Sequence, residues 1–195
     1  RIDGGRLRPE DSSPLVREVL DLCRHYQRAT AGHFNAWAGG HLDPSGLVKG
    51  WAIDRACRIL ERFGGRNYVL DAGGDVMARG HNGSGGPWRV GIRHPVERNL
   101  VARVVLASDL AVATSGTYEK GAHIIDGVTE RPARELVSLT VVGPDMVEAD
   151  VFATAAFAAG EHGLELIAGL PGYEAYAIWP DLHAAWTPGL DALWA

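Results

Sequence analysis

Six short β-favouring segments follow one another between residues 67 and 142, with no helical pattern between them. Most are rich in β-branched residues, and glycine or proline punctuates the run. Their sequences are NYVLDAGG, DVMARG, WRVGIRH, RVVLA, AVATSG and LVSLTVV. A doubly wound parallel fold would alternate strands with helices, so this pattern instead indicates an α+β domain of mixed sheet and helix.

Two amphipathic patterns precede these segments and predict helices. The first begins at Ser12 or Ser13 with Pro14 in its first turn, and it stops by Gly32. The second runs from about Leu47 to residue 63, where two glycines end it. The residues expected to face the core are Leu15, Val19, Leu22, Cys23 and Tyr26 in the first helix, and Trp51, Ala52, Ala56, Ile59, Leu60 and Phe63 in the second.

The segment from Val137 to Gly160 is almost wholly apolar and predicts a third helix toward its end. The sequence EAYAIWP, residues 174–180, predicts a last strand. With 195 residues, 46% of them hydrophobic and 22% charged, the chain has the composition of one globular domain.

Charge and hydropathy exclude two classes of partner. The formal net charge is -5 and the basic residues are scattered, so we expect no nucleic acid to bind. No apolar run reaches the ~20 residues of a spanning helix, so we expect no transmembrane segment in this chain.

Cys23 and Cys57 fall at apolar helix positions and lack the spacing of a metal or redox pair. Both are therefore predicted to be buried free thiols, which favour a reducing compartment and a cytoplasmic location. The chain opens at Arg1 in polar, turn-like sequence, so we expect a segment of the natural protein to precede it. A removed amino-terminal signal would place the protein in the periplasm or at a membrane.

Asp150 and Thr154 are the polar residues that stand out in the apolar segment. They are four residues apart, so on a helix their side chains project from one face. A carboxylate and a hydroxyl are oxygen ligands of the kind that Mg²⁺ takes together with phosphate oxygens. The alternative is that Asp150 caps the helix, which is the commoner role for such a residue taken alone.

Glycines and a lysine provide a second set of candidates. The sequence DAGGD puts Gly73, Gly74 and Asp75 directly after a strand, where backbone without a Cβ atom can approach a ligand. A simple hairpin turn is the alternative reading. Lys49 lies in the first turns of the second helix, where exposed N–H groups can hold an anion, although a solvated lysine would look the same.

The sequence ATSGTYEKGAHIID gives a third set. Thr114, Ser115, Gly116 and Tyr118 supply hydroxyl groups and flexible backbone after a strand. His123 and Asp126 follow closely enough to share a pocket, and a histidine beside a carboxylate can move a proton near neutral pH. A polar turn with a hydrogen-bonded histidine is the alternative.

In order along the chain, these motifs resemble the ApbE family of FAD:protein FMN transferases, also known as thiamine-biosynthesis lipoproteins. The matching stretches are LDPSGLVKGWAIDRA, NYVLDAGGDVMARG, PWRVGIRHP, VATSGTYEKGAHIIDGVTERP and EADVFATAAFAAG. The resemblance covers most of residues 1–195 and implies a single domain with a central FAD cleft, lacking the family's amino-terminal segment. It further implies Mg²⁺ as cofactor and FAD as substrate, with FMN transferred to a threonine of an acceptor flavoprotein and AMP released.

The resemblance also assigns roles to particular residues. Asp150 and Thr154 stand at the family's metal-binding positions, with a backbone carbonyl of Leu47 or Val48 as a further ligand. His123 would remove the proton of the acceptor hydroxyl, with Asp126 nearby. The residues expected to contact FAD are Lys49, Gly73, Gly74, Asp75, Thr114, Ser115, Gly116, Tyr118, His123 and Thr129.

Three residues depart from the family pattern. Asn35 replaces a more usual aspartate, and Gly127 and Glu130 stand where proline and glycine are usual. Asn35 carries no charge, and Glu130 disfavours a left-handed backbone conformation. These departures predict altered or lost activity, so a non-catalytic FAD-binding protein remains an alternative to the transferase. An FAD diphosphatase is a second alternative, because the sequence does not tell whether water or a threonine reaches the phosphorus.

Overall fold

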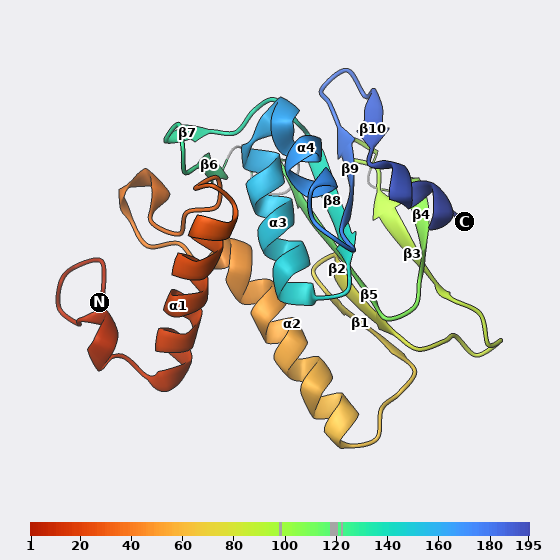
Figure 1. The fold of residues 1–195 in the computed structure, drawn as a ribbon, viewed down its shortest axis with the longest axis horizontal. Helices are drawn as coiled ribbons and strands as arrows, with labels where there is room; N and C mark the ends of the chain where they lie inside the picture. The colour runs from red at the N-terminus through yellow and green to blue at the C-terminus, as the bar shows by residue number, and fades with distance from the viewer. Residues whose placement is uncertain (98, 118–120, 122) are drawn as a thin grey trace.

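The structure of the protein is a computed structural model that describes residues 1–97, 99–117, 121 and 123–195. Its centre is a six-stranded antiparallel sheet with the strand order β1-β2-β5-β8-β9-β10 (Figure 1). The strands are β1 (Tyr68–Ala72), β2 (Asp75–Arg79), β5 (Leu110–Gly116), β8 (Ser138–Gly143), β9 (Glu174–Ile178) and β10 (Ala184–Trp186). The predicted α+β class is confirmed.

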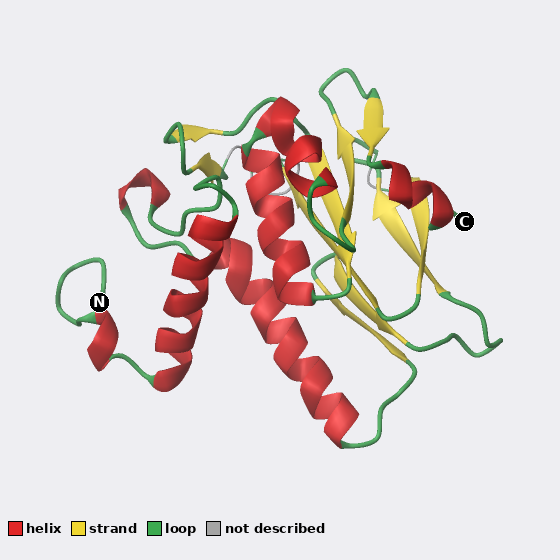
Figure 2. Cartoon of the chain, viewed as in Figure 1, coloured by secondary structure: helices red, strands yellow, loops and turns green. Residues whose placement is uncertain are grey.

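The helices lie on one side of this sheet (Figure 2). They are α1 (Pro14–Ala29), α2 (Ser45–Arg62), α3 (Met146–Ala158) and α4 (Gly163–Ala168), with 3-10 turns η1 (Pro9–Asp11), η2 (Ala38–Gly40) and η3 (Gly160–His162). A further 3-10 turn, η4 (Pro188–Ala192), belongs to the opposite face. Helix α3 packs against β5, β8 and α2, so its residues are buried almost all the way round. This packing explains why its sequence is apolar without a helical stripe.

A second layer covers the other face of the sheet. It consists of the hairpin of β3 (Trp88–Arg93) and β4 (Val101–Ala107) together with η4. In β2, Met77 packs into the core under the helices, whereas its neighbours Val76 and Ala78 pack under the hairpin. Successive side chains on a strand point to opposite faces, so β2 is buried on both. A small hairpin of β6 (Ile125–Asp126) and β7 (Arg131–Pro132) lies apart from the main sheet.

Helix α1 begins at Pro14 and is capped by Ser13, one of the two caps that the sequence predicted. The Ser13 side chain accepts a hydrogen bond from the Val16 amide at 3.4 Å, and Pro14 follows as the first helical residue. The buried face starts only at Val19, so the prediction that Leu15 is buried was wrong; Leu15 is exposed in the first turn.

The prediction of which residues of α2 face the core was also wrong. Its buried residues are Leu47, Gly50, Ile53 and Cys57, whereas Phe63 is 88% exposed. Ala52, Ile59 and Leu60 are exposed as well, and Trp51 and Ala56 are half-buried. The contact with α3 centres on a glycine, which adds nothing to a hydrophobic stripe. The pattern was therefore read on the wrong side of the helix.

Short elements near the carboxyl end escaped prediction. The expected last strand is β9, but β10 follows it after a polar turn, so it is not the last. Helix α4 was not predicted either. Both cysteines are buried free thiols, as expected.

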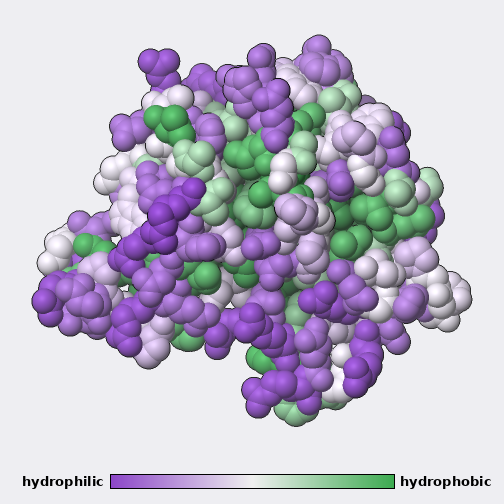
Figure 3. All heavy atoms as spheres, in the orientation of Figure 1, coloured by the Kyte–Doolittle hydropathy of each residue, from purple (hydrophilic) through white to green (hydrophobic). Residues whose placement is uncertain are grey.

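The molecular surface is mainly hydrophilic on the face drawn in Figure 3, with hydrophobic residues interspersed over its middle. Among the described residues, no helix combines the length and the hydrophobicity needed to cross a bilayer.

Glu130 adopts the left-handed backbone conformation that a glutamate disfavours. It ends the turn between β6 and β7 with a φ of 55°, in the left-handed region that costs a residue with a Cβ atom about 1 kcal/mol or more. We expect Glu130→Gly to raise the free energy of unfolding by about 1 kcal/mol in urea denaturation. Thr129→Gly, next to it but outside the left-handed region, should give no such gain, and an equal gain from both changes would contradict the explanation.

Candidate functional site

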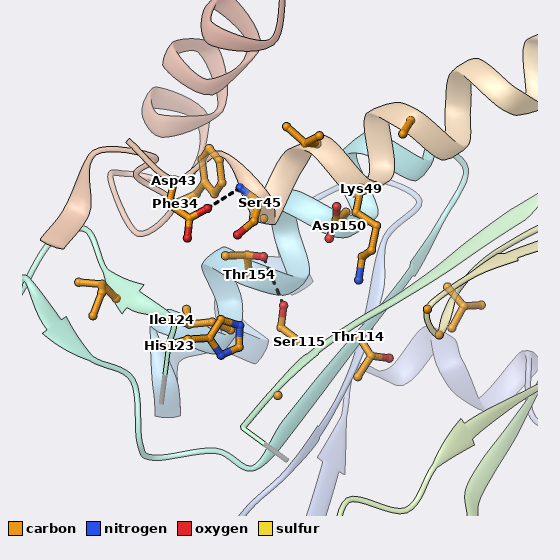
Figure 4. Close-up of a pocket in the computed structure, with 18 of the residues that line it drawn as sticks. Phe34, Asp43, Ser45, Lys49, Thr114, Ser115, His123, Ile124, Asp150 and Thr154 are labelled. Carbon is orange, nitrogen blue, oxygen red and sulfur yellow. Dashed lines mark hydrogen bonds between the residues drawn. The ribbon is translucent and has the colours of Figure 1, made fainter. Parts of the chain in front are cut away.

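A cavity of about 1100 Å³ opens where the amino-terminal end of α2 meets α3, β5 and the turn between β1 and β2. Figure 4 shows side chains from these separate elements converging on it. Its lining includes His33, Phe34, Asn35, His41, Asp43, Ser45, Gly46, Val48, Lys49, Asp71, Gly73, Gly74, Ile92, Arg93, Thr114, Ser115, Gly116, His123, Ile124, Asp150 and Thr154.

Most of the predicted site residues line this one cavity. They are Val48, Lys49, Gly73, Gly74, Thr114, Ser115, Gly116, His123, Asp150 and Thr154. Asp75, Asp126 and Thr129 do not line it, and Leu47 is fully buried beneath it. Tyr118 lies outside the described residues.

Asp150 is an interior residue of α3. The helix is capped by Asp145, whose side chain accepts a hydrogen bond from the Glu148 amide at 3.0 Å, so the reading of Asp150 as a cap is wrong. Asp150 is 4% exposed. One turn further on, the Thr154 hydroxyl lies 3.3 Å from the Ser115 hydroxyl of β5 (Figure 4). The two predicted metal ligands therefore do share one face and one cavity.

Two glycines of α2 let this helix approach α3 closely. The Gly50 amide donates a hydrogen bond to Asp150 Oδ2 at 2.7 Å. A Cβ atom at Gly50 would lie 2.6 Å from the Met146 carbonyl oxygen, and one at Gly46 would lie 2.8 Å from the Thr154 hydroxyl oxygen. Neither position has room for a larger side chain without movement of α3 or of Thr154.

Lys49 forms an ion pair with a buried acid. Its Nζ lies 2.6 Å from Asp75 Oδ2, and Asp75 is 1% exposed. Lys49 is therefore more than a solvated surface lysine. Burial raises the pKa of Asp75, which the Lys49 charge opposes. Burial, and then the charge of Asp75, raise the pKa of Asp150 to about 7.

The two-glycine sequence forms a hairpin turn that is also part of the cavity wall. Gly73 and Gly74 have φ angles of 67° and 94°, the conformation of a tight two-residue connection between antiparallel strands. Asp71 accepts a hydrogen bond from the Gly74 amide at 2.9 Å. The hairpin reading is confirmed, and the turn that joins β1 and β2 also presents its backbone to the cavity. Contact of this backbone with a ligand stays a prediction.

His123 is held by the backbone. Its Nδ1 lies 2.9 Å from the Gly121 carbonyl oxygen. A carbonyl oxygen can only accept, so Nδ1 carries the proton and Nε2 is the basic nitrogen. A neutral His123 in this arrangement can therefore accept a proton at Nε2.

Asp126 pairs with a different histidine. Its Oδ1 lies 2.8 Å from His33 Nδ1, and its two oxygens accept hydrogen bonds from the Val128 and Thr129 amides. Burial alone would raise the pKa of Asp126, but the hydrogen bonds from Thr129, His33 and the backbone together lower it. Asp126 holds the turn after β6, and its predicted catalytic role beside His123 stays a prediction.

Asp43 is a cavity residue that the sequence analysis did not single out. It accepts a hydrogen bond from the Ser45 amide at 3.0 Å at the start of α2 (Figure 4). Burial would raise its pKa, but hydrogen bonds from Ser45 and the nearby His41 and His123 lower it. An aspartate just before Pro-Ser at a helix start was the available signal. Phe34 and Arg93 carried no comparable signal.

Two departures from the family pattern fit their local structure. Asn35 lines the cavity, and its side-chain oxygen accepts a hydrogen bond from the Trp37 amide at 2.9 Å. Gly127 packs against the Gly32 carbonyl and Asn35 so closely that a Cβ atom would clash with both. A proline could not replace Gly127 here without rearranging that contact.

The donors at Asp150 and Thr154 suit a hard cation. Within the ranges that the structure describes, no three His, Cys, Asp or Glu side chains form a metal cluster. A cation here would instead take one carboxylate, a hydroxyl and a backbone carbonyl, completed by water or ligand oxygens, as Mg²⁺ does. The buried Asp150 carboxylate, whose ionisation is resisted by burial, would gain from such a countercharge.

A family model and the curated relatives place this chain in the same protein family. The model of the ApbE family matches residues 37–177. The chain is 34% identical over 148 residues to the FAD:protein FMN transferase of Escherichia coli (strain K12), covering 71% of this chain and 42% of that protein. It is 41% identical over 142 residues to the FAD:protein FMN transferase of Rhodobacter capsulatus, covering 69% of this chain and 27% of that protein. The chain thus spans less than half the length of these curated relatives.

Solved structures share the fold. The flavin transferase ApbE from Vibrio cholerae superposes with a TM-score of 0.78 at 22% identity, covering 93% of this chain and 77% of that chain. The ApbE protein from Thermotoga maritima gives a TM-score of 0.83 at 22% identity, covering 93% of this chain and 78% of that chain.

Proposed function

The chain belongs to the ApbE family, and on that premise we propose that it is a Mg²⁺-dependent FAD:protein FMN transferase. It would move FMN from FAD onto a threonine hydroxyl of an acceptor flavoprotein and release AMP. The observation that carries the proposal is the convergence of Lys49, Asp150, Thr154 and His123 on one cavity of about 1100 Å³. That volume lies slightly above the usual range of pockets for drug-sized ligands, which leaves room for a dinucleotide.

The charged end of the cavity suits the pyrophosphate of FAD. Asp150 and Thr154 would hold Mg²⁺ together with the backbone carbonyl of Val48, which lines the cavity, in preference to that of the buried Leu47. The bound cation would supply neutralisation of the charge that develops on the phosphate oxygens. Lys49 would add a positive charge beside it, and the Gly73–Gly74 backbone would face the ligand without Cβ atoms.

In the proposed reaction, the threonine oxygen attacks the phosphorus of the FMN half. A new oxygen–phosphorus bond forms, and the bond from that phosphorus to the bridging oxygen of the pyrophosphate breaks. AMP leaves with the bridging oxygen, and His123 Nε2 takes the threonine proton. The Ser115 and Thr114 hydroxyls on β5 would contact the flavin side of the substrate.

The test is a reaction with two products. The longest natural chain is incubated with FAD and Mg²⁺, with and without a peptide that carries an acceptor threonine. Release of AMP together with an FMN-sized gain in peptide mass, both lost on chelation of the metal, supports the transferase. AMP without peptide modification would favour FAD diphosphatase activity, and bound FAD without AMP would favour a non-catalytic binding protein.

His123→Ala tests the proposed base. We expect FAD turnover to fall about 100-fold, the size of effect typical for a positioned general base. FAD affinity should change little, because the proton transfer belongs to the chemical step. His25→Ala, which removes a histidine from α1 that does not line the cavity, is the matched control. Unchanged turnover in His123→Ala would remove the histidine from the mechanism.

A further inference from the structure

We infer that Asp75 is a positioning residue that holds the Lys49 ammonium group at the cavity wall, where it meets the pyrophosphate of FAD. This role deepens the proposed function and rests on it. Family resemblance placed Asp75 among residues that contact the ligand. In the structure it lies behind the cavity lining, 1% exposed, with its carboxylate directed at residues that do line it.

The contacts of Asp75 link three elements of the site. Its Oδ2 lies 2.6 Å from Lys49 Nζ on α2, and its Oδ1 accepts a hydrogen bond from the Thr114 amide of β5 at 3.0 Å. The Asp150 carboxyl of α3 is also within its electrostatic reach. Asp75 itself begins β2 directly after the Gly73–Gly74 turn. Its position is therefore fixed by the sheet, independently of the helices.

Lys49 needs such an anchor. Its side chain is 39% exposed and long, so without a fixed partner the ammonium group would sample solvent. A second carboxylate within its electrostatic reach is that of Asp150, the proposed metal ligand. A Lys49 released from Asp75 would pair with Asp150 or turn to water, and either movement removes the cation from the pyrophosphate site.

The substitution Asp75→Asn removes one of the two contacts of Asp75 and keeps the other. Asp75→Asn has nearly the same shape and keeps an oxygen that can accept the Thr114 N–H, but it removes the charge that attracts Lys49. The fold between β2 and β5 should therefore persist while the ion pair is lost. Asp109→Asn is the matched control for loss of one negative charge. Asp109 is an exposed acid on the β4–β5 connection, and its side chain accepts a hydrogen bond from the Gly80 amide.

The experiment is a double-mutant cycle in FAD affinity, measured by equilibrium dialysis with the metal chelated so that no turnover occurs. The four chains are wild type, Asp75→Asn, Lys49→Met and the double variant. We expect Asp75→Asn to weaken FAD binding about tenfold although it removes a negative charge near an anionic ligand. In the Lys49→Met background the same change should weaken binding no further.

Each other result is decisive. Unchanged FAD affinity in Asp75→Asn would overturn the positioning role alone. An equal loss in the Lys49→Met background would show that Asp75 acts through the fold and not through Lys49, and thermal unfolding of the same variants would register that loss. No FAD binding by the wild-type chain, either with the metal chelated or with Mg²⁺ present, would overturn the proposed function and this role with it.

Discussion

Asp150→Asn should abolish AMP release and flavin transfer and yet make the metal-free protein more stable above neutral pH. The loss of activity should be about 100-fold or more, because asparagine cannot supply the anionic ligand that the proposed cation needs. Asparagine still offers an oxygen to the Gly50 amide, so the contact between α2 and α3 can persist. The variant therefore separates loss of chemistry from loss of fold.

The stability gain follows from the direction of the Asp150 pKa. An aspartate in the unfolded chain has a pKa near 3.8, and burial raises that of folded Asp150 to about 7. The unfolded state therefore loses this proton first as pH rises. The stabilisation from protonated Asp150 is fully present below pH 3.8 and is lost as pH rises through about 7. Above that pH the wild-type fold contains an unfavourable buried charge that the variant lacks.

The measurement is the melting temperature of wild type and variant without metal at pH 5 and pH 8. We expect Asp150→Asn to melt about 5 °C higher at pH 8, with a much smaller difference at pH 5. Asp109→Asn provides the exposed control and should show no pH-dependent difference. A variant that retains AMP release, or that differs from wild type equally at both pH values, would contradict this account.

Gly50→Ala should be the most destabilising single-methyl change in α2. The new Cβ atom would press on the Met146 carbonyl oxygen of α3, a backbone atom that cannot rotate away. We expect a loss of about 3 kcal/mol in the free energy of unfolding, near the top of the range for overpacking, despite the better helix propensity of alanine. Urea denaturation monitored by tryptophan fluorescence measures it.

Gly46→Ala is the matched comparison on the same helix. Its new Cβ atom would meet the Thr154 side chain, which can rotate, so the stability loss should be smaller. The rotation would turn a proposed metal ligand away, so Gly46→Ala should raise the Mg²⁺ concentration needed for half-maximal activity. Equal stability losses for the two variants would show that the interhelical distance does not set the cost.

The seven longest strands could be predicted because each carries a run of β-favouring residues that ends at a turn signal. The two- and three-residue strands β6, β7 and β10 could not, because so few residues show no alternation. The phase of α2 was misread for a different reason. Its closest contact is made by Gly50, and hydrophobicity does not report a contact made by an absent side chain.

In the candidate site too, some features could be predicted from the sequence and others could not. Asp150 and Thr154 were identifiable because two polar residues at helical spacing stand out in an apolar segment. Asp75 was predicted to contact FAD, but it lies behind the cavity lining and faces Lys49, because a motif does not tell whether an acid faces a ligand or a lysine. The pairing of Asp126 with His33 joins positions 93 residues apart and leaves no mark in local sequence.

The hydrogen bond from Gly50 to Asp150 joins residues separated by 100 positions, and this separation affects biosynthesis. Chains are made from the amino terminus, so α2, the Gly73–Gly74 turn and β5 leave the ribosome well before α3. Until residue 154 has emerged and α3 has docked, the nascent chain has Lys49 and Asp75 but neither of the proposed side-chain metal ligands, Asp150 and Thr154. The proposed flavin chemistry thus becomes available only to a chain in which α3 has docked against α2, so the site is completed late in synthesis.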